Sequence, residues 1–263
     1  MASFMSFIHH LPWVTIFGLL GNVISMMMCL SPAPTFYRIY KKKSTEGYQC
    51  VPYVVTLFSG MLWIFYAFYD PNSTFILTIN SFTVFLESVY IVIFLFYGTK
   101  EARITAIKLI LLINVAGFGA VAFVVLVIAK SNQMRLKIMG WICLIFAACV
   151  FVAPLAVMRQ VIRTKSVEYM PFLLSLFLTL NAITWFFYGL IKHDYYVALP
   201  NVAGFIFSLA QMVLYAIYRK SKETVTDEDP KEKKLTELTS DQVIDVENPQ
   251  PQPVKAAANG GAE

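Results

Sequence analysis

Amide and indole side chains occur in pairs at matching places in the two halves of the chain. Asn80 and Asn201 lie 121 residues apart, and Trp63 and Trp185 lie 122 residues apart. An amide both donates and accepts hydrogen bonds, while an indole adds a flat apolar face. The two pairs therefore suit an uncharged molecule that carries hydroxyl groups and also has apolar C–H faces.

Each of these side chains lies inside a long apolar run, which limits what it can contact. An unpaired asparagine in hydrocarbon is costly, so both amides must face protein or water. A single asparagine would more often join two helices by a hydrogen bond. Two asparagines at equivalent positions of a repeat instead converge on a common axis, which favours contact with a ligand. The tryptophans lie well inside their runs, which disfavours an interfacial aromatic belt, and helix packing is their other interpretation.

The same spacing recurs at proline, polar and aromatic positions. The further pairs at an offset of 122 are Pro32/Pro154, Ser44/Ser166, Glu46/Glu168 and Tyr66/Tyr188. Chance could match aliphatic residues in two apolar runs, but not this many polar, proline and aromatic positions. The sequence therefore predicts an internal duplication.

The elements that carry these pairs are predicted to be membrane-spanning helices. The chain is 58% hydrophobic and only 14% charged, and a bilayer core needs about 20 apolar residues in helical form. Seven windows qualify: Pro12–Pro32, Cys50–Tyr69, Phe75–Tyr97, Leu109–Ala129, Ile138–Met158, Met170–Leu190 and Tyr196–Tyr218. The loops between them are short, so consecutive helices are expected to be antiparallel neighbours.

These spans predict an all-α integral membrane protein with two parallel three-helix repeats. Residues 1–104 form the first repeat, residues 105–130 a linker helix, and residues 131–220 the second repeat. Three spans end on the opposite side of the membrane from their start, so the linker helix lets the second repeat insert in the same orientation. Residues 221–263 are polar and almost without aromatic residues, which predicts a disordered tail.

Charge placement predicts the orientation and excludes other classes of protein. Of the Lys and Arg residues that flank the spans, thirteen lie on the side of the C-terminus and four on the other. This places the C-terminus in the cytosol and the N-terminus outside. The basic residues form short clusters between apolar runs, which disfavours nucleic-acid binding. No histidine, cysteine or acidic set has the spacing of a catalytic or metal site, so we expect no enzyme activity and no cofactor.

Several segments resemble the SWEET sugar transporters, also called the MtN3/saliva family. The matching segments run through residues 21–25 (Gly-Asn-Val-Ile-Ser), 42–47 (Lys-Lys-Ser-Thr-Glu-Gly), 61–64, 164–168 and 198–201. Parallel repeats are the known architecture of this family. The resemblance implies facilitated sugar transport in both directions by alternating access, a plasma-membrane location and a homo-oligomer. It also implies that Asn80, Asn201, Trp63 and Trp185 line the sugar pocket.

The resemblance further implies which residues set the size of the pocket. Met28/Val150 and Ser59/Asn181 are paired at the same offset of 122, and Ser25 lies beside them in the first span. In the family, small residues at these positions leave room for a disaccharide and bulkier ones favour a hexose. The set here is mixed, but the overall similarity favours sucrose, with glucose as the alternative.

Six residues are expected to move or close the transporter. The resemblance implies hinges at Pro32, Pro52, Pro154 and Pro171, and an outer closure made by Tyr66 and Asp194. Because Asp194 lies in a short loop, a plain solvated charge is its other interpretation.

One acid, Glu87, lies within the third span, where an ionisable residue suggests proton coupling. The second repeat has Ser208 at the equivalent position, so we favour a structural role for Glu87 and uncoupled transport. A seven-helix receptor and an amino-acid carrier of related fold are the rival functions. The duplication disfavours the receptor, and the neutral paired positions disfavour a charged substrate.

Overall fold

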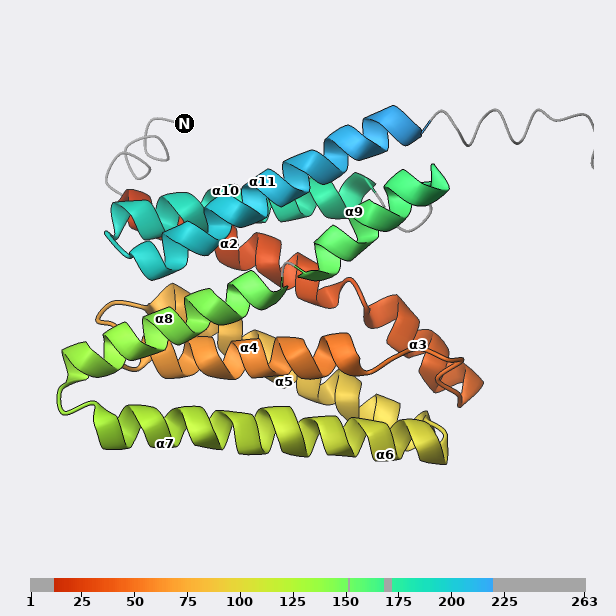
Figure 1. The fold of residues 1–263 in the computed structure, drawn as a ribbon, viewed down its shortest axis with the longest axis horizontal. Helices are drawn as coiled ribbons and strands as arrows, with labels where there is room; N and C mark the ends of the chain where they lie inside the picture. The colour runs from red at the N-terminus through yellow and green to blue at the C-terminus, as the bar shows by residue number, and fades with distance from the viewer. Residues whose placement is uncertain (1–11, 151, 168–171, 220–263) are drawn as a thin grey trace, which may run out of the picture.

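The structure is a computed structural model that describes residues 12–150, 152–167 and 172–219, and its regular elements are helices (Figure 1). They are α2 (Trp13–Leu30), α3 (Ala33–Lys42), α4 (Val51–Ala67), α5 (Thr74–Tyr97), α6 (Lys100–Leu109), η1 (Ile110–Gly117), α7 (Phe118–Ile128), α8 (Asn132–Val150), α9 (Val152–Thr164), α10 (Phe172–Ile191) and α11 (Tyr195–Tyr218). The segment η1 is a π-helix that continues α6 into α7.

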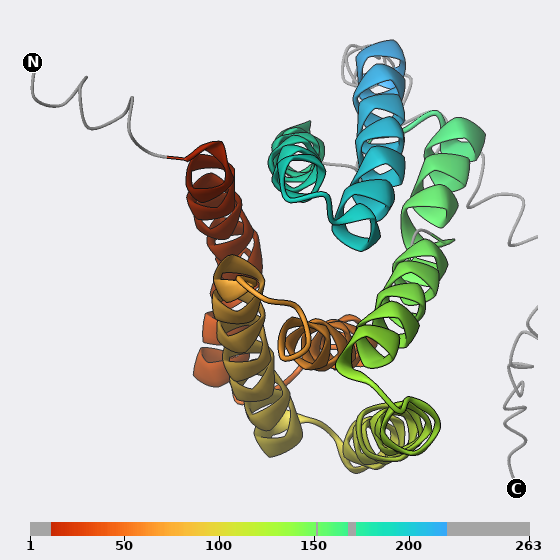
Figure 2. The same cartoon turned by 90° about the vertical axis from the view of Figure 1, so that its left-hand side faces the viewer.

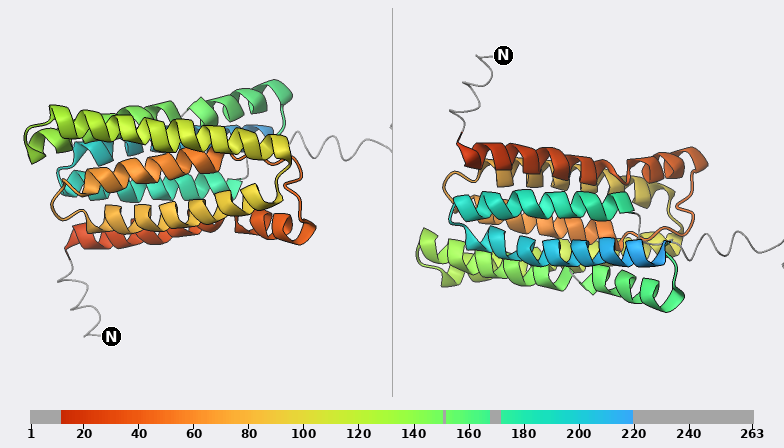
Figure 3. Two further views of the ribbon diagram at one scale, coloured as in Figure 1. Left: turned by 90° about the horizontal axis from the view of Figure 1, so that it is seen from below. Right: turned by 90° about the horizontal axis from the view of Figure 1, so that it is seen from above.

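The described residues form seven helical rods that cross the molecule, which confirms the predicted fold class. Six are long and apolar enough to span a membrane, and α2–α3, α6–η1–α7 and α8–α9 each count as one of them. The seventh, α4, has 17 residues, or about 26 Å of helix, near the lower limit for a bilayer core. The connections lie at two opposite ends of the bundle (Figure 3). We call the end at residue 13 the N-terminal end and the end at residue 219 the C-terminal end.

Helix boundaries differ from the predicted windows where polar turns extend a span. The linker rod begins at Lys100 rather than at Leu109, and the fifth rod runs from Asn132 to Thr164. A window of apolar residues shows how much of a helix lies in hydrocarbon. The helix itself can continue beyond the window with residues that carry charged side chains. The predicted disordered tail, residues 221–263, lies outside the described residues.

The two repeats pack through their first and second helices (Figure 2). In the first repeat α2 and α4 pack on α5, and in the second repeat α8 and α10 pack on α11. Contacts of α2 with α10 and of α4 with α8 join the repeats, and the linker rod packs against α4. This arrangement leaves the inner faces of six helices around a common centre.

Backbone and side-chain details repeat along with the helices. Lys43 and Lys165 both end a helix with φ of 54°, and both donate from Nζ to a tyrosine hydroxyl, of Tyr97 and Tyr218 respectively, at 3.1 Å. The two lysines stand at equivalent positions of the repeat and share this left-handed conformation and this contact, which supports the internal duplication. The partition of the chain at residues 104, 130 and 220 stays a prediction.

Three of the four predicted hinge prolines stand at helix boundaries or breaks. Pro32 precedes α3 directly, Pro52 lies in the first turn of α4, and Pro154 lies in the first turn of α9. These are positions where a missing N–H costs little. Pro171 lies outside the described residues. The prediction missed Pro200, which lies inside α11 next to Asn201.

The tight pairing of α10 with α11 depends on Gly189. A Cβ atom there would lie 2.7 Å from the backbone nitrogen of Ala198 and 2.9 Å from the backbone oxygen of Asp194. We expect Gly189→Ala to lower the free energy of unfolding by about 1–3 kcal/mol, because backbone atoms cannot move aside. Thermal unfolding in detergent measures this. Gly119→Ala is the control, since a Cβ atom there meets open space, and an equal loss in both variants would contradict the close approach.

Candidate binding cavity

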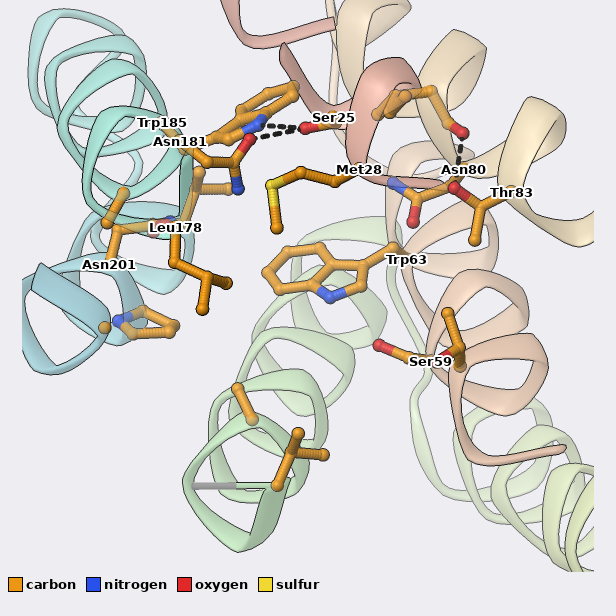
Figure 4. Close-up of a pocket in the computed structure, with 18 of the residues that line it drawn as sticks. Ser25, Met28, Ser59, Trp63, Asn80, Thr83, Leu178, Asn181, Trp185 and Asn201 are labelled. Atoms are coloured by element: carbon orange, nitrogen blue, oxygen red, sulfur yellow. Dashed lines mark hydrogen bonds between the residues drawn. The ribbon is translucent and has the colours of Figure 1, made fainter. Parts of the chain in front are cut away.

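One cavity of about 420 Å³ lies between the two repeats and collects the predicted contact residues (Figure 4). Its walls include all nine of them: Ser25, Met28, Ser59, Trp63, Asn80, Val150, Asn181, Trp185 and Asn201. They come from α2, α4, α5, α8, α10 and α11. The structure thus brings together residues separated by up to 176 positions, although ligand contact by each of them stays a prediction.

The two asparagines have the same local geometry. Nδ2 of Asn80 donates to the carbonyl oxygen of Ile76 at 2.8 Å, and Nδ2 of Asn201 donates to that of Val197 at 2.7 Å. Each bond reaches back one turn and fixes the side chain on the inner face of its helix. Neither amide makes another hydrogen bond within the described residues. Each therefore keeps its carbonyl oxygen available to accept from a hydroxyl group.

The two tryptophans differ in how their N–H groups are used. Trp185 is buried and donates from Nε1 to Oγ of Ser25 at 3.0 Å, and Ser25 donates to Oδ1 of Asn181 at 2.6 Å. Trp63 lies on the opposite wall, with the side chain of Met28 between the two indoles (Figure 4). Each indole also packs edge-on against the tyrosine three residues later, Tyr66 or Tyr188. Apolar faces are thus available on both sides of the cavity.

Polar contacts join the two repeats between the cavity and the N-terminal end, and closure of the cavity by Tyr66 and Asp194 stays a prediction. The hydroxyl of Tyr66 donates to Oδ2 of Asp194 at 2.9 Å, and Lys192 pairs with Asp70 and with Ser73. Asp194 also accepts from the N–H of Val197 through Oδ1 and so caps α11. Burial raises the pKa of Asp194, while its hydrogen bond from Tyr66 lowers it. Since Asp194 is only 8% exposed, it is not the plain solvated charge of the alternative interpretation.

The pair of Asp70 and Lys192 was missed by sequence reasoning. The two residues lie 122 positions apart, so the duplication placed them at equivalent sites with opposite charges. A search of the repeat for complementary rather than similar residues would have found them.

The cavity continues toward the C-terminal end instead. Its wall there includes Thr56, Pro154, Ser208 and Gln211. Gln211 is ten residues beyond Asn201 on α11, or about 15 Å along the helix axis. The cavity therefore extends further toward the C-terminal end of the bundle than toward the N-terminal end.

Comparison with known proteins identifies the family. The model of the family of sugar efflux transporters for intercellular exchange matches residues 15–102 and 137–223. These two matches fall on the two repeats and leave out most of the linker rod, residues 103–128. The chain belongs to this family, the SWEET transporters.

Individual relatives agree over most of the chain. The bidirectional sugar transporter SWEET10 of Arabidopsis thaliana is 50% identical over 232 residues, which are 88% of this chain and 79% of that protein. SWEET13 of Oryza sativa subsp. japonica is 53% identical over 207 residues, 79% of this chain and 70% of that protein. The solved structure of a eukaryotic SWEET transporter superposes with a TM-score of 0.73 at 32% identity and covers 79% of this chain and 97% of that chain. The homologues are SWEET transporters and not enzymes.

In this SWEET protein, the intramembrane acid stands apart from the cavity. Glu87 is 4% exposed, and its Oε2 has no hydrogen-bond partner among the described residues. It is not part of the cavity wall, whereas its neighbours Thr83 and Cys29 are. Within the described residues, no group of three or more His, Cys, Asp or Glu side chains could hold a metal ion.

The closure at the N-terminal end yields a prediction about the pair of Asp70 and Lys192, whose side chains are 12% and 13% exposed. We expect Asp70→Lys to lower the free energy of unfolding by about 3 kcal/mol, since it leaves two cations in one nearly buried place. The charge swap Asp70→Lys with Lys192→Asp should restore most of this loss. Thermal unfolding of the four proteins gives the coupling energy. If the losses of unfolding free energy in the two single variants simply add in the charge swap, the interaction of Asp70 with Lys192 contributes no specific stabilisation.

Proposed function

We propose that this SWEET protein carries sucrose across the membrane in both directions, without coupling to another solute. The observation that carries the proposal is the cavity in which the paired amides and indoles meet. Its volume of about 420 Å³ falls in the range of small-molecule sites. Its relatives in Arabidopsis and rice are named bidirectional sugar transporters.

The composition of the wall supports a neutral substrate. None of the described residues that line the cavity is Asp, Glu, Lys, Arg or His. A charged solute such as an amino acid would need an ionic partner or would lose its hydration without compensation. Hydroxyl groups can instead bond to the free amide oxygens, while the sugar ring lies against the indole faces. The same absence of ionisable groups supports transport that follows the gradient.

The closed N-terminal end and the deep opposite arm support alternating access. We infer that this conformation faces the cytosol, because most of the Lys and Arg residues that flank the spans lie at the C-terminal end. Opening to the outside then requires the bonds of Asp194 with Tyr66 and of Lys192 with Asp70 to break. Hinges at the prolines that interrupt or begin α3, α4 and α9 would let the two repeats rotate. The plasma membrane is the location implied by the family, and assembly with further copies stays a prediction.

The extent of the cavity favours sucrose over glucose. Met28 narrows the space between the two indoles (Figure 4). The arm of the cavity toward Gln211 adds length that a single ring does not need. A two-ring sugar uses this length.

Reconstituted protein in liposomes tests the proposal. Labelled sucrose should enter down its gradient, and Asn201→Ala should reduce the flux about tenfold, since one or two hydrogen bonds to the sugar are lost. Ser81→Ala, an exposed position next to Asn80 on α5, is the matched control and should keep full flux. No sugar flux from folded protein would overturn the proposal, and flux of glucose alone would change the substrate.

A pH gradient across the same liposomes tests the uncoupled mechanism. We expect equal initial rates of sucrose uptake with and without the gradient, because no acid or base lines the cavity. Glu87→Gln should leave this equality unchanged. A faster rate that depends on both the proton gradient and Glu87 would show coupling.

A further inference from the structure

The two repeats differ in the arm of the cavity that extends toward the C-terminal end. In the first repeat, equivalent positions hold Tyr53, Glu87 and Tyr90, and in the second they hold Ser175, Ser208 and Gln211. Tyr90 stacks on Phe36 with ring centroids 4.3 Å apart and meets Tyr53 edge-on. This aromatic cluster fills the space on the side of the first repeat. None of Tyr53, Glu87 and Tyr90 lines the cavity.

The second repeat instead presents small and polar side chains to the same arm. Ser208 and Gln211 both line the cavity, and Ser175 lies directly behind Gln211. All three are buried, at 2%, 7% and 2% exposure respectively. Buried polar groups in a membrane protein are costly unless they are paired or face a polar cavity.

The hydrogen bonds of these residues leave specific atoms unused. Ser208 donates to the carbonyl oxygen of Phe205 at 3.1 Å, which leaves its oxygen free to accept. Ser175 donates to Oε1 of Gln211 over a long 3.4 Å, and this is the one hydrogen bond that Gln211 makes with the described residues. The Gln211 amide can therefore donate into the cavity. This is a donor and acceptor set of the kind that binds hydroxyl groups.

The spacing along α11 matches a ligand that extends from the asparagine level. Asn201, Gly204, Ser208 and Gln211 all line the cavity, at intervals of three, four and three residues, so they share one helix face. Ser208 lies about 10 Å along the axis from Asn201. Gly204, between them, has no side chain to obstruct this stretch. Helix side chains lean toward the N-terminus, so Gln211 reaches back toward Ser208.

We propose that Ser208 and Gln211, supported by Ser175, form a second hydroxyl-binding subsite that holds the second ring of a disaccharide. The first ring lies beside Met28 and against the indoles of Trp63 and Trp185, at the level of Asn80 and Asn201. A hexose fills only this first level and does not reach Ser208. The inference rests on the proposed sugar transport and adds a reason for a preference among sugars. With this subsite, the sugar leaves the cavity along the polar face of α11 rather than along α5.

Transport of two sugars by the full-length reconstituted protein tests the subsite. In the double variant Ser208→Ala with Gln211→Leu, transport efficiency should fall about tenfold for sucrose and stay within about twofold for glucose. Gln133→Leu makes the same amide-to-leucine change at an exposed position of α8 and should change neither sugar. Asn201→Ala should reduce both sugars, which separates the two levels of the cavity. If the double variant does not fold, Ser208→Ala alone carries the test, because Ser208 bonds only to its own helix.

The outcomes separate the subsite from the proposed function. Equal loss of both sugars in folded double variant, or unchanged sucrose transport, overturns the subsite and leaves sugar transport standing. Wild-type protein that moves glucose but no sucrose also overturns the subsite. Wild-type protein that moves neither sugar overturns the proposed function and, with it, the subsite.

Discussion

A polar cavity inside hydrocarbon is stable only if the groups on its wall are already hydrogen-bonded when no ligand is present. Here the wall meets this constraint with bonds inside each helix. Thr56, Thr83 and Ser208 donate to carbonyl oxygens three or four residues earlier in their own helices, as the two asparagines do. Each side chain uses a donor in this way and keeps an acceptor for the cavity. The wall is therefore stable when empty and can still bind hydroxyl groups.

The duplication places asparagines that are hydrogen-bonded within their own helices on opposite walls of the cavity. Positions at which the repeats differ make the two ends of the cavity unlike each other. At the N-terminal end, equivalent positions carry the opposite charges of Asp70 and Lys192, which attract each other across the repeats. Toward the C-terminal end, equivalent positions hold part of an aromatic cluster around Tyr90 in the first repeat and the cavity-lining residues Ser208 and Gln211 in the second. The residues that the two repeats share thus form the pocket. The residues that differ join the repeats at the N-terminal end and line one side of the C-terminal arm with polar groups.

The paired residues of the cavity wall could be predicted from the sequence because the repeat offset acts as a distance restraint. Asn80 and Asn201, or Met28 and Val150, are remote in the chain, but equal offsets place them around one axis. The offset paired Pro32 with Pro154, which lie where α3 and α9 begin, but it could not show how far these helices continue beyond the apolar windows. It also missed Pro200, which has Ile79 at the equivalent position, and the pair of Asp70 and Lys192, whose members are chemically opposite. Similarity between repeats finds shared residues, whereas closure and direction depend on residues that differ.

Hydrogen bonds of α2 indicate which contacts must change when the cavity opens to the other side. Asn22 donates to Thr78 at 2.7 Å and Cys29 meets Thr83 at 3.3 Å, so α2 is bonded to α5 within its own repeat. Ser25 instead bonds to Asn181 and Trp185 of the second repeat.

The linker rod belongs with the first repeat, because Asn114 in η1 is buried and donates to the carbonyl oxygen of Val54 at 3.3 Å. Under the proposed alternating access, rotation of one repeat against the other would leave the bonds of Asn22 and Asn114 intact and would break those of Ser25. Ser25 lies on the cavity wall itself. A ligand that competes for Asn181 or for the indole N–H of Trp185 would weaken the same bonds that join the repeats there, so the proposed mechanism would couple binding and opening through one hydroxyl group.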